Sequence, residues 1–266
     1  MGLGKIGLPV ATYVSKYFEV TGYDINEAAI SIALEKKIRA SNKLSFADVY
    51  VIVVNTYYKE NSPDMSAVGS CCSKISQINA NALVCFESTL SVGTARKMSL
   101  DYNLKYVIVC PHRWWEEDQV NHGVKQLRVI GAINDQSMQK ATAFYDSLQI
   151  PLHRVSSLEL AEATKVAENA HRYVQIAFAE ELKLVADKNG FDFEEWREAM
   201  NTKWNVNLPE ARKGIGKECL PKDTLFLTEL DGKAFLVTGA IKANTRYVKH
   251  IERIKKEKAA KLKLKV

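Results

Sequence analysis

Apolar residues in the first half of the chain gather in short runs, and longer amphipathic stretches separate these runs. The run at residues 49–54, Val-Tyr-Val-Ile-Val-Val, is apolar at every position, which is typical of a parallel strand covered on both faces. Further strands are expected at residues 82–86, 106–110, 127–131 and 152–155, and helices at residues 27–36, 66–75, 93–100 and 135–148. This alternation predicts that residues 1–156 form an α/β domain with a Rossmann-type, doubly wound parallel sheet.

The pattern changes to a helical period after residue 155. Residues 158–188 contain neither Gly nor Pro, and Gly190 is a typical C-terminal stop. A shorter helix is expected at about residues 193–202. We therefore predict an all-helical second domain at residues 157–266, joined to the first by the long helix. A helix of about thirty residues is long for a globular domain, and it favours either a span between two domains or packing against a second copy in a homodimer.

The bulk composition is that of an ordinary globular protein, with 47% hydrophobic and 26% charged residues. No apolar run approaches the roughly eighteen residues of a membrane span, and no secretory leader precedes the first motif. A cytoplasmic protein without a membrane partner is therefore expected. The five cysteines lack the spacing of a disulfide framework or of zinc ligands, which favours reduced thiols and no metal site.

Much of the net charge of +6 lies in residues 249–265, which carry eight Lys or Arg residues against two Glu residues. Basic tails can bind nucleic acid. Aromatic residues are sparse in this tail, so bases would have no platform on which to stack, and a nucleic-acid partner is not expected. A solvated terminal helix is the favoured interpretation.

The chain opens with the glycine pattern Gly2-Leu-Gly4-Lys5-Ile6-Gly7. In a G-x-G-x-x-G loop the first glycine permits a tight turn, and the second lets the backbone approach a pyrophosphate. The third lets a helix pack closely on the sheet. Gly2, Gly4, Lys5, Ile6 and Gly7 are therefore predicted to hold the phosphates of a dinucleotide.

An acidic residue follows the loop at the distance that suits a ribose contact. Asp24 ends an apolar segment and lies twenty residues after Gly4. Its carboxylate can accept hydrogen bonds from a ribose diol and would repel a 2′-phosphate, which favours NAD over NADP. A helix at residues 9–18 would direct its N-terminal N–H groups at the phosphates. Because the chain opens directly on the glycine loop, the strand that normally precedes such a loop is expected to be nearly absent.

Polar turns follow three of the expected strands, at residues 55–56, 87–89 and 111–113. Ligands of open α/β sheets bind beyond the carboxyl ends of the strands. Asn55 and Thr56 are therefore predicted to contact the dinucleotide as well.

Two polar residues share one face of the long helix. Lys165 and Asn169 are four positions apart, and an ammonium group beside a carboxamide can stabilise an oxyanion. Surface decoration is the alternative interpretation. Cys219 lies in the loop segment 214–224 with Lys217 and Lys222 near it in sequence, and such neighbours can lower the pKa of a thiol. The residues alone leave open whether Cys219 is a nucleophile or an inert apolar residue.

Taken together, these motifs resemble the UDP-glucose/GDP-mannose dehydrogenase family, whose members are NAD-dependent four-electron oxidases of nucleotide sugars. The matching segments occur in the family's order and extend over nearly the whole chain. They are residues 2–9, 22–25, 62–66, 87–94, 127–131, 161–170, 201–203 and 214–223.

The resemblance implies a covalent mechanism that centres on Cys219. The thiolate would trap the aldehyde of a first oxidation as a thiohemiacetal, and a second oxidation would leave a thioester for water to cleave. Lys165 and Asn169 would stabilise the oxyanions of these steps. Asp223 would orient the hydrolytic water and the lysine.

The resemblance also implies a site around the cofactor, NAD, and an assembly. Thr89 would place a hydroxyl group near the nicotinamide and the reacting water, and Glu116 would lie near the cofactor. The long helix would form a homodimer. The expected function is oxidation of the C6 hydroxyl group of a nucleotide sugar to a carboxylate.

Two departures from the family pattern leave alternatives open. The family commonly has Pro-Glu where this chain has Pro111-His112, and His112 can be either a catalytic base or a neutral hydrogen-bonding residue. Members usually continue into a third domain that holds the nucleotide, so a separate chain is a candidate source of that domain. The alternative functions are a catalytically impaired NAD-binding partner subunit and a two-electron hydroxy-acid dehydrogenase.

Overall fold

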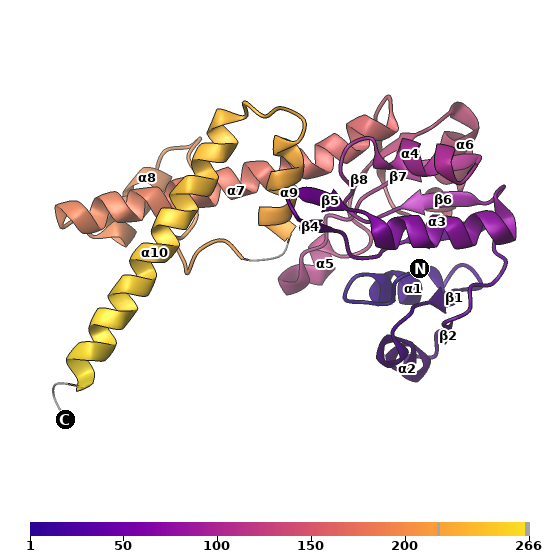
Figure 1. The fold of residues 1–266 in the computed structure, drawn as a ribbon, viewed down its shortest axis with the longest axis horizontal. Helices are drawn as coiled ribbons and strands as arrows, with labels where there is room; N and C mark the ends of the chain where they lie inside the picture. The colour runs from indigo at the N-terminus through magenta and orange to yellow at the C-terminus, as the bar shows by residue number, and fades with distance from the viewer. Residues whose placement is uncertain (217–218, 264–266) are drawn as a thin grey trace. The chain divides into compact units, whose positions relative to one another are not determined.

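The computed structural model describes residues 1–216 and 219–263, which form two compact units, Met1–Lys165 and Val166–Val266 (Figure 1). The first unit contains the strands and most of the shorter helices. The second unit is helical, and α7 (Leu158–Asn189) begins in the first unit and continues into the second.

A five-stranded sheet in the order β3-β6-β7-β8-β9 forms the centre of the first unit. The strands are β3 (Val49–Ile52), β6 (Leu83–Phe86), β7 (Tyr106–Val109), β8 (Arg128–Ala132) and β9 (Leu152–Arg154). The predicted fold class is confirmed with one departure, because β8 runs antiparallel to β7 while every other neighbouring pair is parallel. No long crossover helix joins β7 to β8, so the chain can return in the opposite direction, whereas α6 (Asp135–Ser147) makes the crossover from β8 to β9.

Helices cover both faces of this sheet, which explains why its strands are apolar at successive positions. In β6, Val84 and Phe86 pack with α3 (Ser66–Asn79) and α4 (Thr94–Asp101). Leu83 and Cys85, on the opposite face, pack with α1 (Gly7–Val14) and α6. Alternate side chains along one strand therefore pack in two separate apolar cores, one on each face of the sheet.

Residues at the start of the chain lie between this sheet and a separate two-stranded parallel sheet of β1 (Thr21–Tyr23) and β2 (Arg39–Ser41). Gly2 donates its N–H to the carbonyl of Tyr23 at 2.8 Å, and Met1 accepts from the N–H of Val53 at 2.8 Å. The expected reduced strand is thus a short bridge that links β1 to the chain just after β3. Helix α2 (Glu27–Glu35) joins β1 to β2.

Four small elements, two strands and two short helices, were not predicted from the sequence. Strands β4 (Tyr57–Lys59) and β5 (Ser62–Asp64) form a hairpin whose two turn residues, Glu60 and Asn61, both have positive φ. This turn type usually carries Asn-Gly, and the absence of glycine removed the sequence signal. The other elements are the short helices η1 (Glu116–Asp118) and α5 (Gln119–His122).

The second unit consists of helices, as predicted. After α7 come α8 (Phe193–Asn201), α9 (Cys219–Thr228) and α10 (Phe235–Lys263). Gly190 adopts φ +74° directly after α7, which is the left-handed conformation of a helix stop. The expectation that Cys219 lies in a loop is wrong, because it is the first residue of α9. Within the described residues, no helix is long and apolar enough to cross a membrane.

Candidate active site

The glycine loop shows a separate steric reason for each of its glycines. Gly2 has φ +87°, and a Cβ atom there would lie 2.3 Å from the carbonyl oxygen of Val53. A Cβ atom on Gly7 would lie 1.9 Å from the carbonyl oxygen of Gly2, so α1 can begin here only with glycine. A Cβ atom on Gly4, in contrast, would meet no atom within 4 Å, which leaves open space for a ligand's phosphates.

Asp24 joins the glycine loop to the end of β1. Its Oδ2 atom accepts a hydrogen bond from the N–H of Leu3 at 2.6 Å, and its Oδ1 atom accepts from the N–H of Asn26 at 2.9 Å. Each carboxylate oxygen has a further lone pair, so this carboxylate can still accept a ribose hydroxyl. The loop residues Lys5 and Ile6 follow Leu3 in sequence, with Lys5 exposed and Ile6 half-buried.

Hydrogen bonds connect the turn that follows β3 with the turn that follows β6. The hydroxyl of Thr56 donates to the carbonyl of Thr89 at 2.7 Å, and the hydroxyl of Ser88 donates to the carbonyl of Val54 at 2.7 Å. The side-chain amide of Asn55 donates to the hydroxyl of Tyr57 at 3.2 Å. The structure therefore brings Thr56 and Thr89, which are far apart in sequence, to the same edge of the sheet.

His112 lies in a buried polar cluster that the sequence did not indicate. Its Nε2 atom contacts the carboxylate of Glu87, which also lies 2.9 Å from Nη1 of Arg128 and accepts from the hydroxyl of Tyr145 at 2.6 Å. Burial and the nearby Arg128 lower the pKa of His112, so the imidazole is neutral at pH 7. Burial opposes ionisation of Glu87, but Arg128 and His112 together lower the pKa of that carboxyl.

Glu162 is a second buried carboxylate that the sequence did not single out. Its Oε2 atom accepts from the N–H of Gly93 at 2.6 Å, and its Oε1 atom accepts from the N–H of Ala95 at 2.7 Å. These N–H groups belong to the first turn of α4, which otherwise leaves them without intrahelical partners. Only the fold reveals this contact, because the partners are 67 and 69 positions apart in the chain.

Of the predicted catalytic residues, Asn169 and Asp223 are in direct contact. The side-chain amide of Asn169 donates to Oδ2 of Asp223 at 2.5 Å, and Nζ of Lys222 lies 2.7 Å from Oδ1 of the same carboxylate. Asp223 is fully buried, so the positive charge of Lys222 and the hydrogen bond from Asn169 compensate for the water that its carboxylate loses. Lys165 lies one helical turn before Asn169 on the same face of α7.

Cys219 differs from the other four cysteines of the chain. Cys71, Cys72, Cys85 and Cys110 are buried, and burial raises the pKa of each of these thiols. Cys219 is exposed and is the first residue of α9. Among the five thiols, Cys219 is therefore the one suited to act as a nucleophile.

Two predicted neighbours of the site are described in part or not at all. Glu116 is the first residue of η1, but its side chain lies outside the described part of the structure. Lys217 also lies outside the described residues. No group of three or more His, Cys, Asp and Glu residues that could hold a metal ion occurs within the described chain.

Comparison with known proteins shows to which family the chain belongs, because several families of dehydrogenases share such a fold. Residues 32–149 match the family model described as "UDP-glucose/GDP-mannose dehydrogenase family, NAD binding domain", and residues 159–247 match the family's central domain. The chain belongs to the UDP-glucose/GDP-mannose dehydrogenase family. The predicted cofactor, NAD, is thereby confirmed, and the family's two matched domains lie largely in the two units of the structure.

Relatives within this family share the fold at modest identity. The UDP-N-acetyl-D-mannosamine dehydrogenase of Salmonella typhimurium is 29% identical over 269 residues, which cover 85% of this chain and 63% of the relative. That of Methanocaldococcus jannaschii is 28% identical over 274 residues and covers 92% of this chain and 64% of the relative. A solved structure, the UDP-D-ManNAc dehydrogenase of Pyrococcus horikoshii, superimposes with a TM-score of 0.81 at 27% identity and covers 92% of this chain and 67% of that chain.

The chain thus spans just under two thirds of the length of the curated family members that it matches. The match to the NAD binding domain begins at residue 32, so the glycine loop and Asp24 lie before the matched residues. For these residues the structure shows the open space at Gly4 and the hydrogen bond between Asp24 and Leu3.

Proposed function

We propose that this chain oxidises the C6 hydroxyl group of a nucleotide sugar to a carboxylate in two NAD-dependent steps. The observation that carries the proposal is the hydrogen bond from Asn169 to Asp223. It holds α9, which begins with the exposed thiol of Cys219, against the face of α7 that carries Lys165. UDP-N-acetyl-D-mannosamine is the first candidate substrate, since it is named for the relatives.

The residues that would hold the cofactor are Gly2, Gly4, Gly7 and Asp24, with Asn55 and Thr56 at the adjoining strand end. The open space at Gly4 and the N-terminus of α1 suit the pyrophosphate, and Asp24 suits a ribose diol. When bound, NAD accepts a hydride in each of the two oxidations.

Cys219 performs the covalent steps. Its thiolate sulfur forms a bond to the aldehyde carbon that the first oxidation produces, and the aldehyde oxygen becomes the oxygen of a thiohemiacetal. The second oxidation converts this adduct to a thioester. Water then attacks the carbonyl carbon, the C–S bond breaks, and the carboxylate leaves. In total one alcohol, two NAD⁺ and one water give one carboxylate, two NADH and three protons.

The neighbouring side chains have separate roles in these steps. Lys165 and the amide of Asn169 stabilise the oxyanions at the adduct carbon, because both are donors on one face of α7. Asp223 orients Asn169 and the attacking water. Thr89 supplies a hydroxyl group near the nicotinamide. For His112, its contact with Glu87 and its lowered pKa favour the neutral hydrogen-bonding role over that of a base.

The ratio of NADH formed to sugar consumed tests the proposal. The purified chain is incubated with NAD and, in turn, UDP-N-acetyl-D-mannosamine, UDP-glucose and GDP-mannose, and the sugar products are identified by mass spectrometry. Two NADH per sugar and a uronic acid product are expected. Cys219→Ser should form no carboxylate, and Cys85→Ser, at a buried thiol, is the matched control. One NADH per substrate would indicate a two-electron dehydrogenase, and NAD binding without turnover would indicate a partner subunit.

We also propose that α7 forms a homodimer. Phe178 and Val185 are seven positions apart on this helix and are 50% and 39% exposed, so they form an apolar stripe on one face. Phe178→Glu should convert the dimer to a monomer in size-exclusion chromatography with light scattering. Trp204→Glu, at a 91% exposed aromatic residue outside α7, should leave the mass unchanged. A monomeric parent chain would contradict the proposal.

A further inference from the structure

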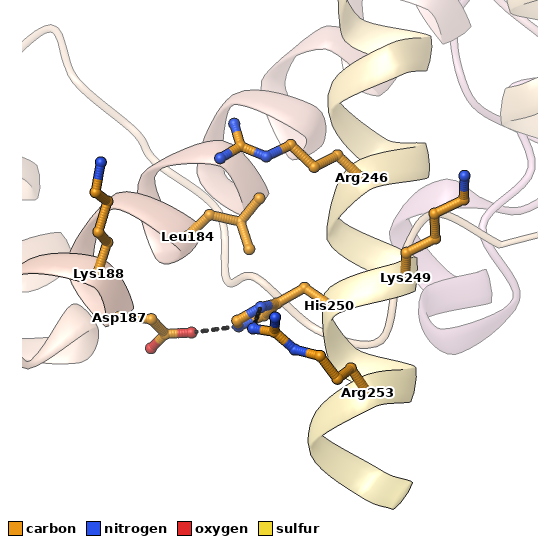
Figure 2. A pocket seen from close by; sticks show the side chains of 7 residues that line it. All are labelled: Leu184, Asp187, Lys188, Arg246, Lys249, His250 and Arg253. Carbon is orange, nitrogen blue, oxygen red and sulfur yellow. Dashed lines mark hydrogen bonds and ion pairs between the residues drawn. The ribbon is translucent and has the colours of Figure 1, made fainter. Parts of the chain in front are cut away.

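A basic pocket lies between the C-terminal part of α7 and the middle of α10. It has a volume of about 530 Å³ (Figure 2). The residues that line it are Leu184, Asp187, Lys188, Arg246, Lys249, His250 and Arg253. Residues three, four and seven positions apart lie on one face of a helix, which explains why these positions of each helix meet in one pocket.

The pocket carries a strong excess of positive charge. Four Lys and Arg side chains line it against the single carboxylate of Asp187, which leaves a net charge of +3 when His250 is neutral. Within the described residues, no carboxylate lies within 4.0 Å of the cationic groups of Lys188, Arg246 or Lys249. Like charges that share a helix face repel one another, so the arrangement favours an external anion.

The carboxylate inside the pocket is already engaged. Asp187 contacts Nζ of Lys183 through Oδ1, and its Oδ2 atom lies 3.0 Å from Nε2 of His250. Burial alone would raise the pKa of Asp187, but the hydrogen bonds from Lys183 and His250 lower it, so the carboxylate stays ionised. Asp187 therefore holds His250 in place and does not neutralise the other cations of the pocket.

The contacts of His250 define its tautomer. Its Nδ1 atom lies 3.4 Å from Nη2 of Arg253, and a guanidinium group can only donate. Nδ1 is therefore the acceptor, and Nε2 carries the proton that is donated to Asp187. Figure 2 shows this chain of contacts from Asp187 through His250 to Arg253. Arg253 thus contacts the pocket through His250, while its Nε atom lies 3.7 Å from the carboxylate of Glu257 on the exposed side.

Arg246 and Arg253 lie on the same face of α10, two turns apart. Seven residues correspond to about 10 Å along a helix axis, and both side chains are long and flexible. Figure 2 shows the guanidinium of Arg246 reaching toward α7, with Lys188 opposite, whereas Lys249 is turned away from Asp187. Two guanidinium groups at this spacing suit an anion with two or more linked phosphate groups better than a single phosphate.

This pocket is distinct from the residues that we assign to the reaction. Asp187 follows Asn169 by eighteen residues on the same continuous helix, which places the two about 27 Å apart along its axis. Among the described residues, no Phe, Tyr or Trp side chain lines the pocket, and the one imidazole, of His250, is engaged with Asp187, so the pocket offers a poor platform for stacked bases of a nucleic acid.

We propose that the pocket between α7 and α10 binds a small anion with two or more linked phosphate groups. Arg246 and Arg253 contact the phosphates as paired donors, and Lys188 adds a third positive charge from α7. Inorganic pyrophosphate and the phosphates of a nucleoside diphosphate share this chemistry. The site would bind its ligand independently of the nucleotide-sugar reaction.

Isothermal titration calorimetry on the full chain tests the proposal with pyrophosphate, ADP and orthophosphate as separate ligands. The pocket variant is Arg246→Gln with Arg253→Gln, and the matched control is Lys255→Gln with Lys256→Gln. The control removes the same charge from exposed positions of the same helix. Any binding at the glycine loop is common to all three proteins and cancels in the comparison.

We expect saturable binding of pyrophosphate that weakens by at least about tenfold in the pocket variant, because two charge-assisted contacts are lost, and by less than about threefold in the control. Orthophosphate should bind more weakly than pyrophosphate. For each ligand only the binding that is lost in the pocket variant is assigned to the pocket. Tighter binding of ADP than of pyrophosphate in this component would identify a nucleotide, and equal binding would identify the phosphate groups alone. Each of these results supports the site.

Three results would overturn the proposal: no saturable binding of pyrophosphate, an equal loss in the pocket variant and the control, or tighter binding of a single-stranded oligonucleotide than of pyrophosphate. Circular dichroism checks that each variant is folded. If the double variant fails to fold, Lys188→Gln at an exposed position of α7 serves instead. The NMR signal of the His250 ring gives a local readout, and it should shift with pyrophosphate in the parent and not in the pocket variant.

Discussion

The side-chain amide of Asn169 donates a hydrogen bond to the buried carboxylate of Asp223, 54 positions further along the chain. This contact joins two residues that the sequence motifs had marked separately. It also holds α9 against α7, so the exposed Cys219 at the start of α9 has a defined position in the second unit. The chemistry that we propose depends on this junction.

Removing the donor of this contact should affect both stability and turnover. Asn169→Ala leaves Oδ2 of the buried Asp223 without its amide partner, which should lower the free energy of unfolding by about 1–3 kcal/mol. Oxidation of the thiohemiacetal should slow as well, because an oxyanion donor is lost. Urea unfolding and single-turnover kinetics measure the two effects.

A double-mutant cycle with Asp223→Ala provides the control for this prediction. The coupling energy between the two positions should exceed about 0.5 kcal/mol, as is usual for residues in direct contact. Additive effects would show that the hydrogen bond contributes nothing to stability.

The glycine loop allows a comparison between two alanine substitutions. Gly7→Ala would place a Cβ atom 1.9 Å from the carbonyl oxygen of Gly2, and we expect a loss of about 3 kcal/mol or failure to fold. Gly4→Ala meets no atom within 4 Å, so the free energy of unfolding should change by less than about 1 kcal/mol. NAD affinity should nevertheless fall, because a methyl group would occupy the space left for the pyrophosphate. Thermal unfolding and an NADH fluorescence titration separate the two effects, and unchanged affinity in Gly4→Ala would refute the assignment of the loop.

His112 can be tested through its pH dependence. Because the imidazole is buried, neutral and in contact with Glu87, we expect His112→Gln to keep the shape of the pH–rate profile. Its cost should be about 1 kcal/mol of stability, since Arg128 and Tyr145 still satisfy Glu87. Disappearance of the acidic limb of the profile, with a large fall in kcat, would instead identify His112 as the catalytic base.

Glu180 should make the protein less stable as the pH rises. Both carboxyl oxygens are buried without a hydrogen-bond partner among the described residues, and burial raises the pKa of this carboxyl to about 7. The folded-state pKa lies above the unfolded value, so the free energy of unfolding decreases as the pH rises from about 4.5 to 7. Above that range it decreases no further on account of Glu180.

Glu180→Leu removes this ionisation and should raise the free energy of unfolding by about 2–3 kcal/mol at pH 8, with little change at pH 4. Unfolding curves at the two pH values measure the difference. Glu181→Leu, at the adjacent exposed position, is the control and should show no such pH dependence. The same gain at both pH values would mean that apolar packing, and not ionisation, is responsible.

Local patterns in the sequence were sufficient to predict most helices and strands of the first unit and the position of the glycine loop. Continuous apolar strands such as β6 indicated a sheet covered on both faces, and the two faces do pack in separate cores. The spacing from Gly4 to Asp24 indicated a carboxylate beside the loop, and Asp24 accepts a hydrogen bond from Leu3 there. These features depend on neighbours in the chain or on a period along one element, so sequence alone determines them.

Only the tertiary structure decided which distant groups meet. Glu87 pairs with Arg128, Glu162 caps α4, and the basic residues of α10 face those of α7. The reversed direction of β8 and the helical start at Cys219 also had no signal in the local pattern. Such contacts depend on how whole elements pack, and a charged side chain looks the same in a sequence whether it faces solvent or a partner many residues away.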